Sequence, residues 1–173
     1  MNVALTGFMG CGKSTYGRAA AEREGLDFVD LDDAILEAHN TACPQQQCSS
    51  DSEIFKLMGE SYFRALETAT LKNLVNTHDG MLIALGGGAV VREENREVLK
   101  ERCRIVWLKA GLDTCLDNIA ATHPRPMLRD KSRSEIEELF GIRNKIYSSA
   151  ADSVIDTDSL GFEEILDSIA AEF

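Results

Sequence analysis

Residues 7–15 read G-F-M-G-C-G-K-S-T and match the phosphate-binding pattern G-x-x-x-x-G-K-[ST]. The apolar run at residues 3–6 predicts a short buried strand before this stretch, and residues 13–24 predict a helix after it. The glycines allow backbone N–H groups to turn toward a phosphate, and the helix N-terminus adds N–H donors and a partial positive charge. We therefore expect the phosphates of a nucleoside triphosphate to bind at Gly10, Cys11, Gly12, Lys13, Ser14 and Thr15.

Lys13 and Ser14 are the members of this motif with side-chain chemistry. The lysine ammonium can reach the β- and γ-phosphates of the nucleotide, and the serine hydroxyl can ligate Mg²⁺. The alternative is a glycine-rich turn that ends in Lys-Ser by chance. The strand and the helix predicted on its two sides favour the phosphate site.

The length and the charge of the chain limit the classes of protein to which it can belong. A chain of 173 residues can bury a sizeable core, so we expect residues 1–173 to form a single domain. The formal net charge of −11 argues against nucleic acid or an anionic membrane as a partner. No apolar run approaches the roughly 20 residues of a membrane helix, and no signal peptide is visible. The five cysteines lack the spacing of a disulfide framework, so a reduced, cytoplasmic protein is the simplest interpretation.

Short apolar runs alternate with helix-like segments along the whole chain. The runs are residues 3–6, 28–30, 81–85, 105–108 and 154–155. The helix-like segments are residues 13–24, 33–38, 60–77, 93–101, 112–122, 134–150 and 162–172. This alternation predicts an α/β fold in which a parallel sheet is covered by helices on both faces, as a three-layer sandwich.

Two segments fall outside this alternation. Residues 40–51 are polar and rich in turn formers, so we expect an exposed, poorly ordered loop there. A zinc site is the alternative, because His39, Cys43 and Cys48 are close in sequence, although no fourth ligand is evident. Residues 123–133 are basic, contain two prolines and lie between predicted helices. They predict either a mobile lid over the phosphates or a solvated connector.

Acidic residues follow the second predicted strand, in the sequence D-L-D. Ligands of open parallel sheets bind outside the carboxyl ends of the strands, which is where Asp30 and Asp32 would lie. Strand alternation would place both carboxylates on the same side, one for Mg²⁺ and one for an acceptor hydroxyl. The alternative is that Asp32 or Asp33 only caps the helix that follows.

Glycines and arginines supply candidates for a second ligand. The three consecutive glycines at residues 86–88 would let a ligand approach the backbone after the third strand. Arg64 and Glu67 are three residues apart on a predicted helix, so the carboxylate can orient the guanidinium. Together with Arg143, Arg64 would offer the fork-shaped donors that suit a carboxylate. A surface ion pair of little consequence is the alternative for Arg64 and Glu67.

These stretches together make the chain resemble the shikimate kinase family. The resemblance rests on the following segments, in the family's order: G-F-M-G-C-G-K-S-T (7–15), D-L-D (30–32), G-E-S-Y-F-R-A-L-E (59–67), G-G-G-A-V (86–90), R-E-E-N-R (92–96), R-P-M-L (125–128) and R-N-K-I-Y (143–147). They cover nearly the whole chain. The first motif is shared by many nucleotide-binding proteins, whereas the pair G-E-x-x-F-R and G-G-G-A-V is quite specific to this family.

The resemblance implies a P-loop kinase fold of the nucleoside monophosphate kinase type, with a five-stranded parallel sheet. It also implies an acceptor-binding region at about 31–66 and a lid at about 122–134. The implied reaction transfers the γ-phosphoryl group of ATP, with Mg²⁺, to the 3-hydroxyl of shikimate, giving shikimate 3-phosphate and ADP in aromatic amino-acid biosynthesis. ATP and shikimate are then the expected partners, and we expect a monomer.

The resemblance also implies residue roles. Lys13, Asp32 and Arg125 would be catalytic, with Arg125 approaching the phosphates from the lid, and Ser14 and Asp30 would hold Mg²⁺. Shikimate would be bound by Asp32, Arg64, Gly86, Gly87, Gly88 and Arg143.

The sequence departs from the family pattern at several places. The segment before Ile54 is several residues longer, Lys145 stands where the family has Pro, and Asn118-Ile119 stand where an arginine often ends the helix. The longer segment makes a related kinase with another acceptor one alternative. A non-catalytic nucleotide-binding regulator of this fold is the other. The presence of Lys13, Asp32 and Arg125 favours catalysis.

Overall fold

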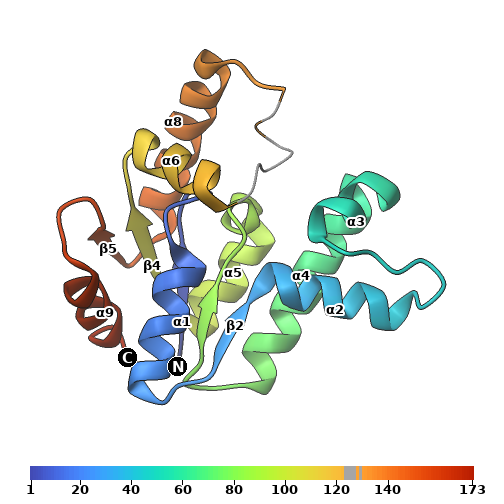
Figure 1. Ribbon diagram of the computed structural model, residues 1–173. Helices are drawn as coiled ribbons and strands as arrows, with labels where there is room; N and C mark the ends of the chain where they lie inside the picture. The colour runs from blue at the N-terminus through green and yellow to red at the C-terminus, as the bar shows by residue number, and fades with distance from the viewer. Residues whose placement is uncertain (123–127, 129) are drawn as a thin grey trace.

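Five parallel strands form the centre of the protein, as the sequence predicts. The fold is described from a computed structural model for residues 1–122, 128 and 130–173. The strand order is β2-β3-β1-β4-β5, so β1 lies in the middle of the sheet (Figure 1). The strands are β1 (Asn2–Thr6), β2 (Phe28–Asp30), β3 (Leu82–Ala84), β4 (Cys103–Lys109) and β5 (Ser153–Asp156).

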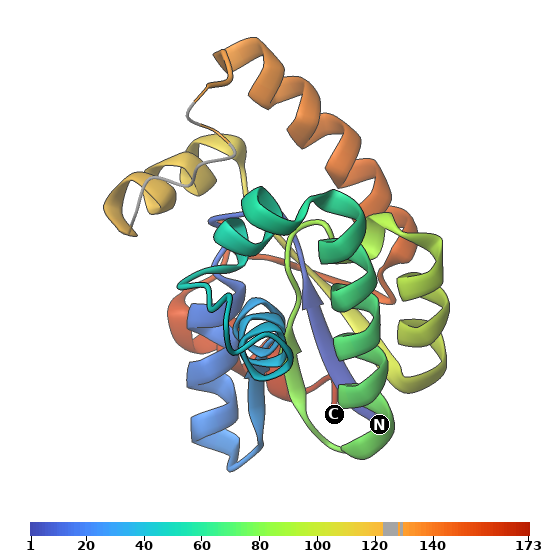
Figure 2. The same ribbon diagram turned by 90° about the vertical axis from the view of Figure 1, so that its right-hand side faces the viewer.

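Helices cover both faces of the sheet, which confirms the three-layer α/β fold. The helix α1 packs against α9 on one face, whereas α4 and α5 lie side by side on the other (Figures 1 and 2). The helices are α1 (Lys13–Glu24), α2 (Leu31–Ala42), α3 (Asp51–Met58), α4 (Glu60–Thr77), α5 (Glu93–Arg102), α6 (Leu112–Thr122), α8 (Arg133–Ala150) and α9 (Phe162–Ala170), with a short 3₁₀ turn η1 (Ala89–Val91). Within the described part of the chain, none of the helices has the length and apolar character that crossing a membrane would require.

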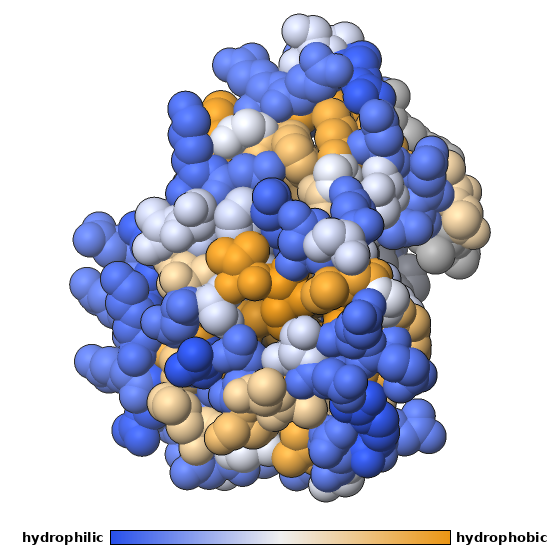
Figure 3. Space-filling view, turned by 90° about the vertical axis from the view of Figure 1, so that its left-hand side faces the viewer, coloured by the Kyte–Doolittle hydropathy of each residue, from blue (hydrophilic) through white to orange (hydrophobic). Residues whose placement is uncertain are grey.

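The core lies on both faces of the central strands. Every residue of β1 is buried, and so is every residue of β3. A parallel sheet covered on both faces needs continuous apolar strands rather than alternating ones, which is why these short runs were readable from the sequence. The edge of the sheet at β5 is less protected, since Val154 of β5 is 52% exposed and Phe162 of the neighbouring helix α9 is 48% exposed. Figure 3 shows the side of the molecule on which β5 and α9 lie.

The segment between β2 and α4 differs most from the sequence-based expectation. The helix α2 begins at Leu31 and reaches Ala42, and α3 (Asp51–Met58) was not predicted at all. Short helices of this kind carry little periodic signal, and α3 depends on its Ser50 cap and on packing of the fully buried Ile54.

The connection between α2 and α3 is exposed along most of its length, as expected, and side chains of α2 bind it at two points. The Asn40 side chain binds the backbone of Cys48 twice, donating to its carbonyl at 2.9 Å and accepting from its N–H at 2.8 Å. Fully buried His39 contacts the Gln46 carbonyl through Nε2 and the Tyr62 hydroxyl through Nδ1, both at 2.9 Å. Because a carbonyl can only accept, Nε2 is the donor, and Nδ1 of a neutral ring then accepts from Tyr62.

The zinc alternative for this connection gains no support. Among the residues that the structure describes, no group of three or more His, Cys, Asp or Glu side chains is arranged to hold a metal ion. The thiol of Cys48 lies 3.5 Å from His39 Nε2, which already donates to a carbonyl. Burial and the nearby Glu53 charge raise the pKa of Cys48, which disfavours the thiolate that zinc needs.

We predict that Asn40→Ala lowers the free energy of unfolding by about 2 kcal/mol, because it leaves both backbone groups of Cys48 without their partner. Asn76→Ala, at an exposed position of α4, is the matched control and should change that free energy by less than about 0.5 kcal/mol. Urea denaturation followed by circular dichroism measures both. Equal values for the two variants would show that the connection does not depend on Asn40.

Candidate active site

The turn between β1 and α1 has the geometry that a phosphate-binding loop needs. Gly10 and Gly12 have φ values of +80° and +96°, a backbone conformation that residues with a side chain rarely adopt. A Cβ on Gly10 would also lie 2.3 Å from the carbonyl oxygen of Cys115 in α6, so that position has no room for a side chain. Gly12 is the residue before the first turn of α1, and the backbone N–H groups of that turn are free for an anion.

Lys13 lies across this loop. Its ammonium donates to the carbonyls of Gly7 at 2.9 Å and Phe8 at 3.2 Å. These contacts hold the cation at the mouth of the loop, next to the N-terminus of α1. Cys115 packs below the loop, and burial raises the pKa of its thiol to about 12, so the group stays neutral beside the phosphate site.

Ser14 and Asp30 meet at the base of the site. The Ser14 hydroxyl donates to Asp30 Oδ2 at 2.5 Å, and Asp30 Oδ1 accepts from the backbone N–H of Asp32 at 3.0 Å. Asp30 ends β2 and is the N-cap of α2. A hydroxyl and a carboxylate oxygen at this distance are the ligand types that Mg²⁺ prefers.

The expected geometry of D-L-D is wrong in one respect. Asp32 lies in the first turn of α2 rather than on the strand, so strand alternation does not place it beside Asp30. The expected cap is wrong as well, because Asp30 caps α2 and neither Asp32 nor Asp33 does. The sequence predicted that this helix begins at Asp33, whereas it begins two residues earlier, at Leu31. The start was hard to predict because Leu31 alone separates the last strand residue from the acidic residues of the helix.

The glycines at residues 86–88 bring the acceptor candidates together. A Cβ on Gly86 would lie 2.6 Å from Asp32 Oδ1, and a Cβ on Gly88 would lie 3.0 Å from Arg64 Nη1. The carbonyl of Gly87 accepts from Arg143 Nη1 at 3.3 Å. One carboxylate and two guanidiniums from α2, α4 and α8 therefore surround a single loop that follows β3.

Arg64 is held by a buried carboxylate. Its Nη1 lies 3.1 and 3.0 Å from the two carboxylate oxygens of Glu67, which is 1% exposed. Arg64 itself keeps 21% of its side chain accessible. A guanidinium fixed from behind and open in front is suited to bind an anionic group of a ligand.

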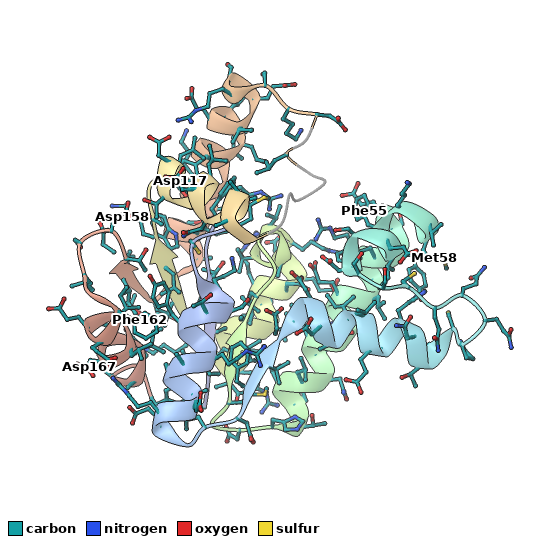
Figure 4. All side chains as sticks on the ribbon, viewed as in Figure 1. Phe55, Met58, Asp117, Asp158, Phe162 and Asp167 are labelled. Carbon is teal, nitrogen blue, oxygen red and sulfur yellow. The ribbon has the colours of Figure 1, made fainter. Side chains whose placement is uncertain are left out.

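The two sides of the site come from different parts of the chain. Figure 4 shows Phe55 and Met58 of α3 on one side of the carboxyl edge of the sheet, with Asp117 of α6 and Asp158 on the other. The helices α2 and α4, which carry Asp32 and Arg64, belong to the first side (Figure 1).

Sequence reasoning missed two residues that shape the site. The hydroxyl of fully buried Tyr147 donates to the Gly87 carbonyl at 2.8 Å, and the Asn118 amide donates to the Gly10 carbonyl at 2.8 Å. Burial raises the pKa of Tyr147, which keeps its hydroxyl a donor. Tyr147 belongs to the R-N-K-I-Y stretch that contributes to the family resemblance, and this is the sequence signal that could have identified it. Arg125 lies outside the described residues, as do the other residues of 123–127 and residue 129 of the expected lid at 122–134.

Comparisons with known proteins point to one family. A family model described as shikimate kinase matches residues 9–173. A shikimate kinase of Xylella fastidiosa is 38% identical over 160 residues, which is 92% of this chain and 84% of that protein. A shikimate kinase of Persephonella marina is 36% identical over 168 residues, which is 97% of this chain and 96% of that protein.

A solved structure shares the fold. The shikimate kinase from Acinetobacter baumannii in complex with shikimate superposes with a TM-score of 0.84 and 30% identity, and the match covers 98% of this chain and 90% of that one. The five-stranded parallel sheet, the phosphate loop and the arginine-flanked glycine loop are thus found in a chain whose sequence matches over nearly its full length. The chain belongs to the shikimate kinase family.

Proposed function

We propose that this protein transfers the γ-phosphoryl group of ATP to the 3-hydroxyl of shikimate, giving shikimate 3-phosphate and ADP in aromatic amino-acid biosynthesis. The observation that carries the proposal is the convergence of Asp32, Arg64 and Arg143 on the glycine loop at residues 86–88. Shikimate has one carboxylate and several ring hydroxyls. Two arginines, one aspartate and an open backbone are the groups that such a molecule requires.

On the nucleotide side, the P-loop backbone and Lys13 would bind the phosphates. Lys13 would exchange its carbonyl partners for phosphate oxygens and stabilise the charge of the group in transfer. Ser14 and Asp30 would hold Mg²⁺, since their oxygens already lie 2.5 Å apart. The ion, when bound, neutralises phosphate charge.

On the acceptor side, Arg64 and Arg143 would bind the carboxylate, and the backbone of residues 86–88 would meet the ring hydroxyls. Asp32 would accept or orient the proton of the attacking hydroxyl. Most of the catalysis would come from positioning and electrostatic stabilisation. Arg125, outside the described residues, keeps the phosphate-binding role that the resemblance implies. A monomeric state and a cytoplasmic location also remain predictions.

ADP release measured in parallel with shikimate, quinate, gluconate and nucleoside monophosphates tests the proposal. We expect turnover with shikimate alone, and we expect Lys13→Ala to lower it by about 10²- to 10³-fold, because the lysine charge acts on the transferring group. A preference for another acceptor would reject the substrate. Wild-type-like turnover in a folded Lys13→Ala protein would reject the mechanism.

The two arginines should act on the acceptor and not on the nucleotide. We predict that Arg64→Ala and Arg143→Ala each weaken shikimate binding by about 10- to 100-fold, the usual worth of a charge-assisted contact, with little effect on ATP. Arg102→Ala, an exposed position at the amino end of β4, is the control. Titration calorimetry with shikimate and with ATP measures both affinities. Unchanged shikimate affinity in both site variants would show that the shikimate carboxylate binds elsewhere.

Asp30 and Asp32 should have separable roles. Asp32→Asn should lower turnover by about 10²-fold or more while Mg²⁺·ATP still binds, because the base is lost. Asp30→Asn should shift activity to higher Mg²⁺ concentration, and since Asn is also a good N-cap, α2 should keep its stability. Turnover as a function of Mg²⁺ checks both variants. Identical metal dependence in all three proteins would show that Asp30 does not serve the ion.

A further inference from the structure

A buried polar cluster lies behind the acceptor loop, and only one of its members, Glu67, has been described above. It consists of Glu67 and Thr68 of α4 and Asn95 of α5, with exposures of 1%, 5% and 0%. Burying three polar side chains is costly unless all of them are hydrogen-bonded. Their contacts show what they hold in place.

Asn95 is the centre of the cluster. Its Nδ2 donates to the Ala89 carbonyl at 2.9 Å and to Glu67 Oε1 at 3.4 Å, and its Oδ1 accepts from the Thr68 hydroxyl at 2.7 Å. A carbonyl and a carboxylate can only accept, so the amide orientation follows from its partners. Thr68 locks that orientation because its hydroxyl supplies the one donor that Oδ1 needs.

This one amide joins both walls of the acceptor site. Ala89 directly follows the glycines at residues 86–88, and Glu67 holds Arg64 through both carboxylate oxygens. The gap between these walls is narrow, since a Cβ on Gly88 would lie only 3.0 and 3.1 Å from the two terminal nitrogens of Arg64. A small shift of either wall would therefore change the space next to the guanidinium.

We propose that Asn95 is a positioning residue for the acceptor: through Glu67 and the Ala89 carbonyl it sets the position of Arg64 relative to the glycine loop, and so the affinity for the acceptor carboxylate. The inference rests on the proposed function, because it takes Arg64 as the carboxylate-binding group. Asn95 touches neither substrate, and it acts on binding of the acceptor rather than on the phosphoryl-transfer step.

A matched pair of variants separates this role from general stability. Asn2 is also a buried asparagine, 1% exposed, and its amide joins the His78 carbonyl and the Met81 N–H at the amino end of the sheet, both at 3.0 Å. Asn95→Ala should raise the shikimate Kd about tenfold and leave the KM for ATP within about twofold. Asn2→Ala should lower the melting temperature by about as much as Asn95→Ala does. It should leave the shikimate Kd and the KM for ATP within about twofold of the wild-type values.

Two further variants keep the test decisive if Asn95→Ala does not fold. Thr68→Val removes only the hydroxyl that orients the amide, and it should raise the shikimate Kd about threefold. In an Arg64→Ala background the effect of either substitution on shikimate binding should vanish, because the residue through which both act is gone. Titration calorimetry on the full chain measures each Kd, and thermal melting reports folding.

The outcomes are distinguishable. Shikimate affinity that is unchanged in folded Asn95→Ala or Thr68→Val, or reduced equally in Asn2→Ala, overturns the positioning role and leaves the proposed function standing. An undiminished effect in the Arg64→Ala background also overturns it. A wild-type protein that does not bind shikimate overturns both proposals.

Discussion

Two glycine loops, one after β1 and one after β3, meet at the carboxyl edge of the sheet, and the site depends on this contact. A Cβ on Gly87 would lie 3.7 Å from the Gly7 carbonyl oxygen and 3.8 Å from the Met9 nitrogen. The strands themselves are paired in register from Val3 with Leu82 to Leu5 with Ala84. The sheet pairing thus fixes where nucleotide phosphates and acceptor would face each other, as in-line transfer requires.

The cations of the site are held by acceptors before any ligand arrives. Lys13 is bound by two P-loop carbonyls, Arg143 by the Gly87 carbonyl and Arg64 by the Glu67 carboxylate. In a protein with a net charge of −11, such anchoring keeps these positive groups in one place against many competing carboxylates. Groups fixed in advance need little reorganisation when charge develops on the substrate, which is how electrostatic catalysis is most effective.

The helices α2 and α4, which carry Asp32 and Arg64, are joined by contacts that involve the connection between α2 and α3. Asn40 and His39 of α2 bind the connection through Cys48 and Gln46, and His39 also contacts Tyr62 of α4. Tyr62 and Arg64 lie on the same helix, and Asp32 begins the helix that ends near His39. These contacts join the carboxyl-terminal part of α2 to the amino-terminal turns of α4, which also carry Arg64, while the connection itself projects outward (Figure 1).

The parallel sheet, the phosphate loop and the candidate acceptor residues could be predicted from the sequence, because those signals are local: apolar runs, a spaced glycine motif and short family stretches. The contacts that hold these residues in place could not be predicted, because they join distant parts of the chain. Asn95 meets Thr68 from 27 positions away, Tyr147 meets Gly87 from 60 and Asn118 meets Gly10 from 108. The place of Asp32 on the helix, by contrast, depends on a local contact, because Asp30 caps α2 by accepting from the backbone N–H of Asp32. A buried asparagine or tyrosine has no periodicity of its own, and its role depends on partners that only packing of distant helices brings within hydrogen-bond distance.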